Sequence, residues 1–214
     1  MKRPTLARKI FCIAALLCAA AWNANAVNIV ADPGFEASAD GLGPHPFSAS
    51  WTDNDPTFSG VGGDSAFAHS GNNYAFLGTP GPFLGSLEQT LVGLVVGQSY
   101  NISFWLANDI TTGLPPGNSF VVVFDGGVDF SIANQGAFGY TQFTISNLVY
   151  TGTNDSLQFA YTHNNDFWRL DDVSVEAAGV PEAFSTIWLA LPAFGALGLV
   201  QFSRARARKS LAQI

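Results

Sequence analysis

The stretch Ser119–Phe130, SFVVVFDGGVDF, combines the two signals that decide the fold of this chain. Its first half is rich in Val and Phe, which are enriched in β-strands. Asp125-Gly126 follows at once, and Asp-Gly is a strong signal for the two-residue turn of a β-hairpin. The stretch therefore predicts a strand, a tight turn and a returning strand. It does not predict an EF-hand, because the alternating oxygen ligands of that loop are absent.

The same pattern extends outward over the middle of the chain. Other segments rich in Val, Ile, Phe, Tyr and Thr are separated by turn residues: Ser99–Ala107, Tyr140–Tyr150 and Ser156–His163. No segment of useful length shows helical periodicity. We expect about eight to ten strands in an all-β, antiparallel two-sheet sandwich over residues 27–177. Asp32–Gly63, richer in Gly, Pro and Asp, should form long loops with one or two short strands.

Charge is distributed very unevenly along the 214 residues. Eight of the nine Lys and Arg lie near the two ends, and between Val27 and Gly179 the single base Arg169 stands against fifteen acids. Such a body repels nucleic acid and anionic lipid at long range, so we expect no nucleic-acid partner. The acidic surface serves solubility, and it could also attract divalent cations.

The two cysteines, Cys12 and Cys18, both lie in the first apolar run. If that run is removed, the mature protein has no thiol and must be stabilised by its core. The three histidines, His45, His69 and His163, show no metal-ligand spacing. A zinc or other transition-metal site is therefore not expected.

Residues 1–26 have the order of a secretory signal peptide. Four bases precede an apolar stretch, and Ala24-Asn25-Ala26 forms an A-x-A cleavage site. Cleavage would leave Val27 as the new N-terminus and export the body. An uncleaved anchor is the alternative; lipidation of Cys18 is disfavoured because the bulky Leu17 precedes it.

Residues 184–202 form a 19-residue stretch without a charge. At about 1.5 Å per residue a helix of this length spans about 28 Å, close to the thickness of a bilayer core. Four bases follow within residues 203–214 and predict a cytoplasmic tail. We therefore expect one C-terminal transmembrane helix with the body on the other side of the membrane.

The C-terminal region resembles the PEP-CTERM sorting signal. Val180, Pro181 and Glu182, in a linker of residues 178–183, precede the apolar stretch and the basic cluster, although Ala183 stands where a second proline is usual. The resemblance implies an exosortase-type processing enzyme in a Gram-negative bacterium that makes exopolysaccharide, with release to the cell surface or matrix. A plain tail anchor is the alternative and predicts the same topology.

The body resembles jelly-roll carbohydrate-binding modules. Four segments match in order: NIVADPGFE (Asn28–Glu36), HSGNNYAFLG (His69–Gly78), SLEQTLVGLVVGQSYNISFWLA (Ser86–Ala107) and FWRLDDVSV (Phe167–Val175). From the first to the last, the matching segments span most of residues 27–176. The resemblance implies a two-sheet jelly roll, a polysaccharide partner and non-catalytic sugar binding.

Modules of this kind frequently hold a structural calcium ion where the first and last strands meet. The resemblance implies Glu36 as the ligand from the first strand, and Asp171 or Asp172 from the last. If Val173 faces the core, strand alternation places Asp171 on the core side and Asp172 outward. The alternatives are that Asp171 pairs with Arg169 or is hydrated at the rim.

Sugar binding needs an exposed aromatic platform with polar neighbours. The candidates are the three tryptophans of the body and two loop asparagines: Trp51, Trp105, Trp168, Asn72 and Asn164. We expect Trp105 to face outward, because its neighbour Phe104 faces inward. Core packing is the alternative for each tryptophan, and loop asparagines also form turns.

No nucleophile motif or phosphate-binding loop occurs, and we expect no enzymatic activity. Glu88 lies on a predicted strand, where a solvent-facing role is expected rather than acid catalysis. The sequence thus predicts an exported envelope protein that binds carbohydrate. A structural matrix or adhesion protein is the alternative; a glycoside hydrolase would require two facing carboxylates.

Overall fold

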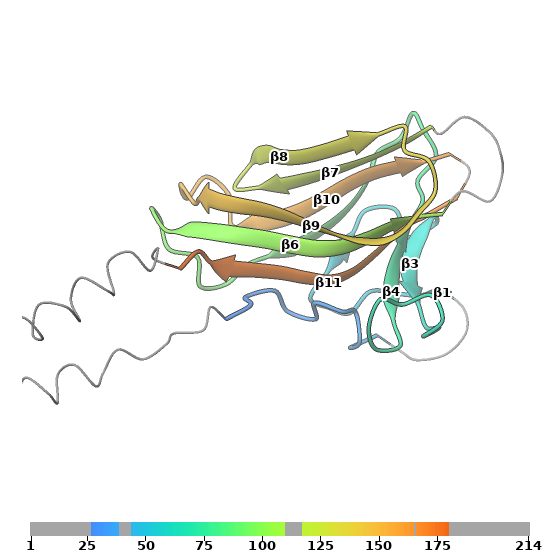
Figure 1. The fold of residues 1–214 in the computed structure, drawn as a ribbon, viewed down its shortest axis with the longest axis horizontal. Coiled ribbons are helices and arrows are strands. Elements are labelled where there is room, and N and C mark those ends of the chain that lie inside the picture. The colour runs from blue at the N-terminus through green and yellow to red at the C-terminus, as the bar shows by residue number, and fades with distance from the viewer. Residues whose placement is uncertain (1–26, 39–43, 110–116, 165, 180–214) are drawn as a thin grey trace, which may run out of the picture. The chain divides into compact units, whose positions relative to one another are not determined.

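In the part of the chain that the structure describes, eleven strands form two antiparallel sheets that face one another (Figure 1). The computed structural model describes residues 27–38, 44–109, 117–164 and 166–179. Within these residues there is no helix, which confirms the all-β expectation. The strands are β1 (Pro44–His45), β2 (Thr52–Asp53), β3 (Ser59–Gly62), β4 (Tyr74–Leu77), β5 (Gly85–Thr90), β6 (Ser99–Asn108), β7 (Asn118–Phe124), β8 (Gly127–Ala133), β9 (Phe138–Val149), β10 (Ser156–His163) and β11 (Trp168–Ala177).

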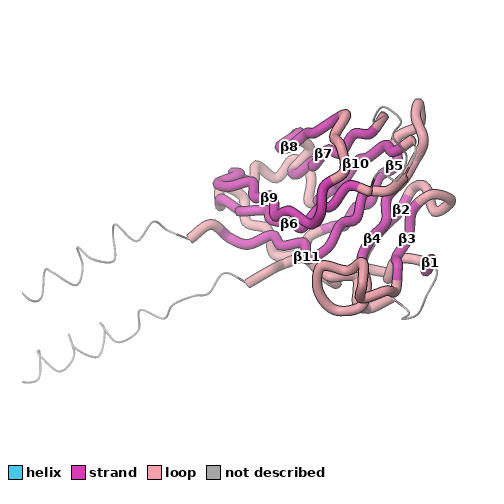
Figure 2. The backbone as a smooth tube through the Cα atoms, turned by 45° about the vertical axis from the view of Figure 1, so that its right-hand side comes forward, coloured by secondary structure: helices cyan, strands magenta, loops and turns pink. Residues whose placement is uncertain are grey.

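The sheets differ in size and both have non-sequential strand order. Sheet A has six strands in the order β1-β3-β4-β11-β6-β9, and sheet B has five in the order β2-β5-β10-β7-β8. Figure 2 shows loops joining the strands at both ends of the two layers. The last strand, β11, lies inside sheet A between β4 and β6, so the end of the domain is bound on both sides.

The β7–β8 hairpin forms at the predicted Asp-Gly turn. Asp125 and Gly126 have φ values of 52° and 80°, as a type I′ turn requires. Along β7, Phe120, Val122 and Phe124 are buried, and the residues between them are half-buried. The buried side chains of β7 therefore point toward the other sheet, and the half-buried side chains between them point away from it.

The early segment has three short strands, β1, β2 and β3, where the sequence predicts one or two. They stay short because Pro44, Pro46 and Pro56 interrupt the pairing, and proline cannot donate to a strand ladder. β1 lies at the edge of sheet A, where a proline is tolerated.

Aromatic side chains fill the space between the sheets. The fully buried Phe104 lies 5.6–5.8 Å, ring centre to ring centre, from Phe120, Phe130, Phe143 and Phe159. Aromatic pairs at this separation contribute roughly 0.5–1.5 kcal/mol each beyond the area they bury. The core therefore supplies cohesion to a body whose sequence contains no cysteine.

The N-terminal residues of the body run beside the last strand. Ile29 N donates to Val175 O at 3.0 Å, and the Asn28 side chain binds the backbone of Val173 and Val175 at 2.9 and 3.0 Å. None of the described residues forms a helix long and apolar enough to cross a bilayer. The expected signal peptide, the sorting motif Val180–Glu182, residues 184–202 and the basic tail lie outside the described residues.

Candidate functional site

A pocket of about 510 Å³ opens on the outer face of sheet A, over β3, β4 and β11. Phe76 on β4 and Arg169 on β11 form its floor; the two residues lie opposite each other on these paired strands. Their neighbours along each strand are buried in the core, so both side chains point to the outer face. Aromatic side chains line most of the remaining wall: Phe58, Phe67, Tyr74 and Phe167. Phe58, Phe67 and Phe167 are 43%, 50% and 37% exposed, so their rings remain open to a ligand.

Three charged side chains complete the pocket: Asp64, Asp109 and Arg169. Arg169 Nη2 donates to Asp109 Oδ1 at 2.5 Å, and Nη1 donates to the Phe67 carbonyl oxygen at 3.1 Å. Its guanidinium also lies 5.4 Å from the centre of the Phe67 ring. Arg169 therefore pairs with Asp109 rather than with Asp171, and its buried Nε has no hydrogen-bond partner among the described residues.

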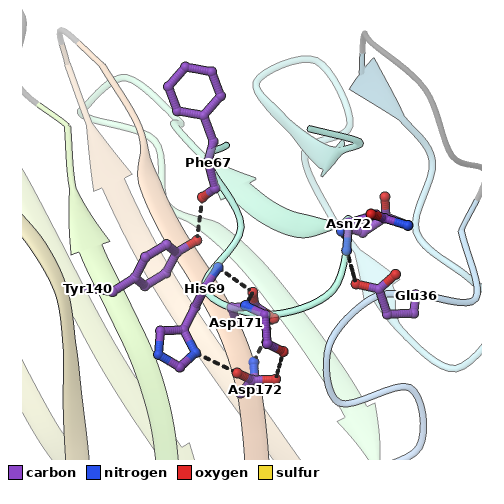
Figure 3. A network of polar contacts seen from close by, with 9 residues as sticks. Glu36, Phe67, His69, Asn72, Tyr140, Asp171 and Asp172 are labelled. Carbon is purple, nitrogen blue, oxygen red and sulfur yellow. Dashed lines mark hydrogen bonds and ion pairs between the residues drawn. The ribbon is translucent and has the colours of Figure 1, made fainter. Parts of the chain in front are cut away.

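The β3–β4 loop (residues 63–73) covers part of this face because buried and exposed carboxylates hold its backbone (Figure 3). Asp171, which is fully buried, accepts hydrogen bonds from His69 N at 2.8 Å and Ser70 N at 3.2 Å. Glu36 Oε1 accepts from Asn72 N and Asn73 N, each at 2.9 Å. Burial raises the pKa of Asp171 to about 6, although these backbone N–H groups favour its charged form.

His69 sits at the centre of an aromatic and ionic cluster. Its ring stacks on Trp105 at 3.8 Å between centres and meets the Tyr140 ring edge-on at 5.4 Å. His69 Nδ1 lies 2.6 Å from Asp172 Oδ2. The Tyr140 hydroxyl donates to the Phe67 carbonyl, and its pKa is raised, chiefly by burial. The cluster fixes Phe67 at the edge of the pocket.

Asp171 lies on the outer side of sheet A, which corrects the prediction from strand alternation. Its register partner is Trp105, whose side chain points away from the core. The pairing of β11 shifts between Asp171 and Ser174, and Asp172 has a φ of 46°. This bulge resets the alternation, so Val173 returns to the core although Asp171 faces outward.

Two of the three predicted calcium ligands lie around Gly34: a Cβ atom at Gly34 would lie 3.5 Å from Asp171 Oδ1 and 3.5 Å from Asp172 Oδ1. The third, Glu36, brings only its Cγ there, at 3.8 Å, and its carboxylate lies beside Gly71 on the β3–β4 loop. Nearby, Asn73 Oδ1 is buried and has no hydrogen-bond partner in the described structure. Over the same residues, no group of three or more His, Cys, Asp or Glu side chains is arranged to hold a metal ion.

Two of the predicted platform tryptophans are core residues. Trp51 is 4% exposed, packs against Phe35 and Phe159, and donates from Nε1 to Asp32 O at 3.0 Å. Trp168 is fully buried and donates to two backbone carbonyls. Their indole N–H groups are satisfied inside the protein, so neither ring offers a face to a sugar.

Trp105 faces outward as predicted, but His69 covers one side of its ring. Asn72 and Asn164 are exposed. Asn164 Oδ1 accepts a hydrogen bond from Gly81 N at 2.7 Å, and Asn164 lines a small hollow of about 140 Å³. Trp105, Asn72 and Asn164 do not line the larger pocket. Glu88 is half-buried on β5, with Gln158 Nε2 at 3.4 Å from its carboxylate.

The sequence reasoning missed the side chains that do line the pocket, chiefly Phe58, Phe67, Phe167, Asp64 and Asp109. All five lie outside the regular strands or at their ends. An available signal was that Phe58 and Phe67 lie among Gly, Ser, Asp and Pro residues typical of surface loops.

No protein-family model matches this chain, and no curated protein matches it either. A family 61 carbohydrate-binding module, TmCBM61, solved with β-1,4-galactotriose, is 20% identical, with a TM-score of 0.50 over 71% of this chain and 99% of that one. A CBM22 tandem of Paenibacillus barcinonensis Xyn10C is 16% identical, with a TM-score of 0.44 over 74% of this chain and 48% of that one. A CBM4 structure is 18% identical, with a TM-score of 0.41 over 70% and 99%. The match to TmCBM61 shows that the sandwich of this chain has a jelly-roll fold like that of this carbohydrate-binding module.

Proposed function

We propose that this domain binds a glycan, without cleaving it, in the pocket on the outer face of sheet A. The observation that carries the proposal is the combination of partly exposed Phe58, Phe67 and Phe167 with the Arg169–Asp109 pair in one pocket. Aromatic rings pack on the apolar faces of sugar rings, and charged groups hydrogen-bond to hydroxyls. The likeness to a module solved with galactotriose supports a polysaccharide as the ligand class.

Binding should be measured by calorimetry and by pull-down on polysaccharides, including β-1,4-galactan, xylan and the exopolysaccharide of the producing strain. Phe67→Ala and Phe167→Ala remove rings from the pocket and should each weaken binding by about 2- to 10-fold, since one aromatic contact contributes roughly 0.5–1.5 kcal/mol.

Phe83→Ala is the matched control, because Phe83 is 72% exposed and does not line the pocket. Its affinity should equal that of the unchanged protein. Equal binding by the Phe67 and Phe167 variants would place the sugar elsewhere, and an absence of binding to every glycan would remove the proposal.

A structural matrix or adhesion protein is the second candidate function. Burial of Trp51 and Trp168 favours it, since it predicts core tryptophans rather than a stacking platform. This alternative also predicts association with the exopolysaccharide matrix, but with no loss when Phe67 or Phe167 is changed. The same pair of variants therefore separates the two functions.

We also propose a structural calcium ion bound by Glu36, Asp171 and Asp172 together with the amide oxygen of Asn73. The Asp171 and Asp172 oxygens around Gly34 support this assignment, as does Asn73, whose backbone N–H binds Glu36 and whose Oδ1 has no partner among the described residues. Calcium accepts carboxylate and amide oxygens. The ion would neutralise two adjacent carboxylates and join the first and last segments of the domain. Millimolar calcium should raise the melting temperature relative to EDTA, and Glu36→Gln should abolish the rise.

Export and sorting complete the proposed function. Residues 1–26 are proposed to be a cleaved signal peptide, residues 184–202 a membrane span, and Val180-Pro181-Glu182 part of a PEP-CTERM-like signal for an exosortase-type enzyme. Mass spectrometry of the protein from its native envelope tests this. A mature form that begins at Val27 and ends near Glu182 is expected, whereas a full-length cytosolic protein would contradict the proposal.

A further inference from the structure

The β5–β6 turn (residues 91–98) presents an uncharged cluster of valines to solvent. Val92, Val95 and Val96 are 82%, 61% and 68% exposed, and Val149 at the end of β9 is 57% exposed. We call these four residues the valine cluster. Residues 91–98 contain no charged side chain. Exposed apolar side chains grouped in this way are typical of interaction surfaces.

The turn is held firmly, so the exposure of its valines is a property of the fold. Gly97 N donates to Tyr150 O at 2.8 Å, and Gln98 N donates to Val95 O at 3.0 Å. Val95 N donates to the Tyr100 hydroxyl at 2.9 Å. Positive φ values at Gly93 and Gly97 shape the turn, and a Cβ at either position would meet nothing within 4 Å.

The valine cluster lies at the end of sheet A where the chain leaves the domain. Val149 pairs with Ser99 on one side of β6, and Ala178 N donates to Ser99 O at 2.8 Å on the other side. The Gln98 side chain also contacts Ala178 O at 3.3 Å. In Figure 1 the end of β11 and the start of β6 lie together at the left of the sandwich.

The sequence beyond this exit is short before it becomes apolar. Five residues, 179–183, separate Ala178 from the uncharged stretch 184–202 and its following bases. A fully extended chain covers at most about 3.6 Å per residue, so this linker spans about 18 Å at most. A bilayer that holds residues 184–202 would therefore lie within reach of the valine cluster.

We propose, building on the membrane span proposed for residues 184–202, that the valine cluster rests on the surface of the lipid bilayer and fixes the orientation of the domain on the membrane. The contact is shallow, because Asp125 on the neighbouring turn is a half-buried carboxylate that binds Thr151 and Thr153. It depends on apolar burial and not on charge, since Arg169 is the one base of residues 27–179. The sugar pocket, built on β3, β4 and the far end of β11, then faces away from the lipid.

The test uses the chain from Val27 to Ile214, which contains no cysteine and keeps residues 184–202, reconstituted in phosphatidylcholine vesicles. A polarity-sensitive fluorophore is attached at Val96→Cys, and in a matched protein at Ser65→Cys, an exposed residue of the β3–β4 loop. The fluorophore at position 96 should emit at a shorter wavelength than the free fluorophore does in buffer. Its intensity should decrease when the vesicles contain brominated lipid. The label at 65 should show neither change.

Replacing Val92 and Val95 by serine in the Val96→Cys protein should remove most of the lipid quenching, without unfolding an exposed turn. Vesicles with added phosphatidylglycerol should quench less, because the acidic body is repelled. The proposal is overturned if both labels respond alike, if neither is quenched, or if the chain does not join vesicles. Energy transfer between labelled copies without lipid quenching would assign the valine cluster to a second copy instead.

Discussion

His163 shows how one residue links burial to pH. It is 3% exposed, its Nδ1 accepts a hydrogen bond from Asp166 N at 2.9 Å, and its Nε2 lies 2.8 Å from Asn108 Oδ1. Since Nδ1 is an acceptor, the proton must be on Nε2 and the ring is neutral. Burial lowers the pKa of His163, and nearby Asp166 and Asp109 oppose this shift only in part.

Stability should therefore decrease as the pH falls. The pKa of His163 is lower in the folded protein than its value of 6.5 in the unfolded chain. Its contribution to stability is therefore present above pH 6.5 and is lost as the pH falls through the pKa of the folded state. His163→Gln, which can still bond to Asn108, should show a smaller decrease between about pH 7 and pH 5. Urea unfolding at each pH measures this, and identical pH profiles for both proteins would contradict it.

At the scale of strands, Asp125 connects the β7–β8 turn of sheet B to the β9–β10 turn, which links sheet A to sheet B. Its carboxylate accepts from Thr151 N, Thr151 Oγ1, Thr153 N and Asn154 N at 2.5–2.9 Å. Slight desolvation would raise the pKa of Asp125, but these hydrogen bonds lower it to about 2. The β7–β8 turn thereby holds the β9–β10 turn (residues 150–155).

Asp125→Asn should keep the β7–β8 hairpin, since asparagine also accepts positive φ, and should weaken the hold on the β9–β10 turn. Amide hydrogen exchange at Thr153 and Asn154 should become several-fold faster, with little change in β7. In the unchanged protein the stabilisation should be present above pH 3.8 and lost as the pH falls through about 2. Unchanged exchange at both amides would show that the carboxylate contributes nothing.

The strands with strong local signals could be predicted from sequence, and the site could not. Alternating residues and the Asp-Gly turn located β6, β7, β9 and β10 within about two residues, because those signals act between neighbours in the chain. The bulge at Asp171 and Asp172 depends instead on the β3–β4 loop that packs over it, far away in sequence. Alternation alone therefore placed Asp171 on the wrong side.

The binding residues escaped prediction for a related reason. Trp51 and Trp168 have the right chemistry for a sugar platform, but each finds a backbone carbonyl for its indole N–H inside the core. Phe67 becomes a pocket residue only because Tyr140 and Arg169 both bind its carbonyl. Which aromatic ring stays exposed is decided by such tertiary contacts.

At the scale of the whole molecule, the acidic body should be sensitive to ionic strength. Between Val27 and Gly179 there are fifteen acidic residues and one basic residue. Repulsion among these negative charges destabilises the folded domain. Raising NaCl from about 10 mM to 300 mM shortens the screening length from about 30 Å to below 10 Å, so the melting temperature should rise by a few degrees. An equal rise with sucrose alone at matched osmolality would assign the effect to solvent exclusion instead.

The position of β11 has a consequence for the order of events during synthesis. Because this last strand separates β4 from β6, sheet A consists of two unjoined halves until residues 168–177 are available. A chain still emerging from the ribosome cannot complete this sheet. Sheet A therefore closes only when the final strand has been synthesised.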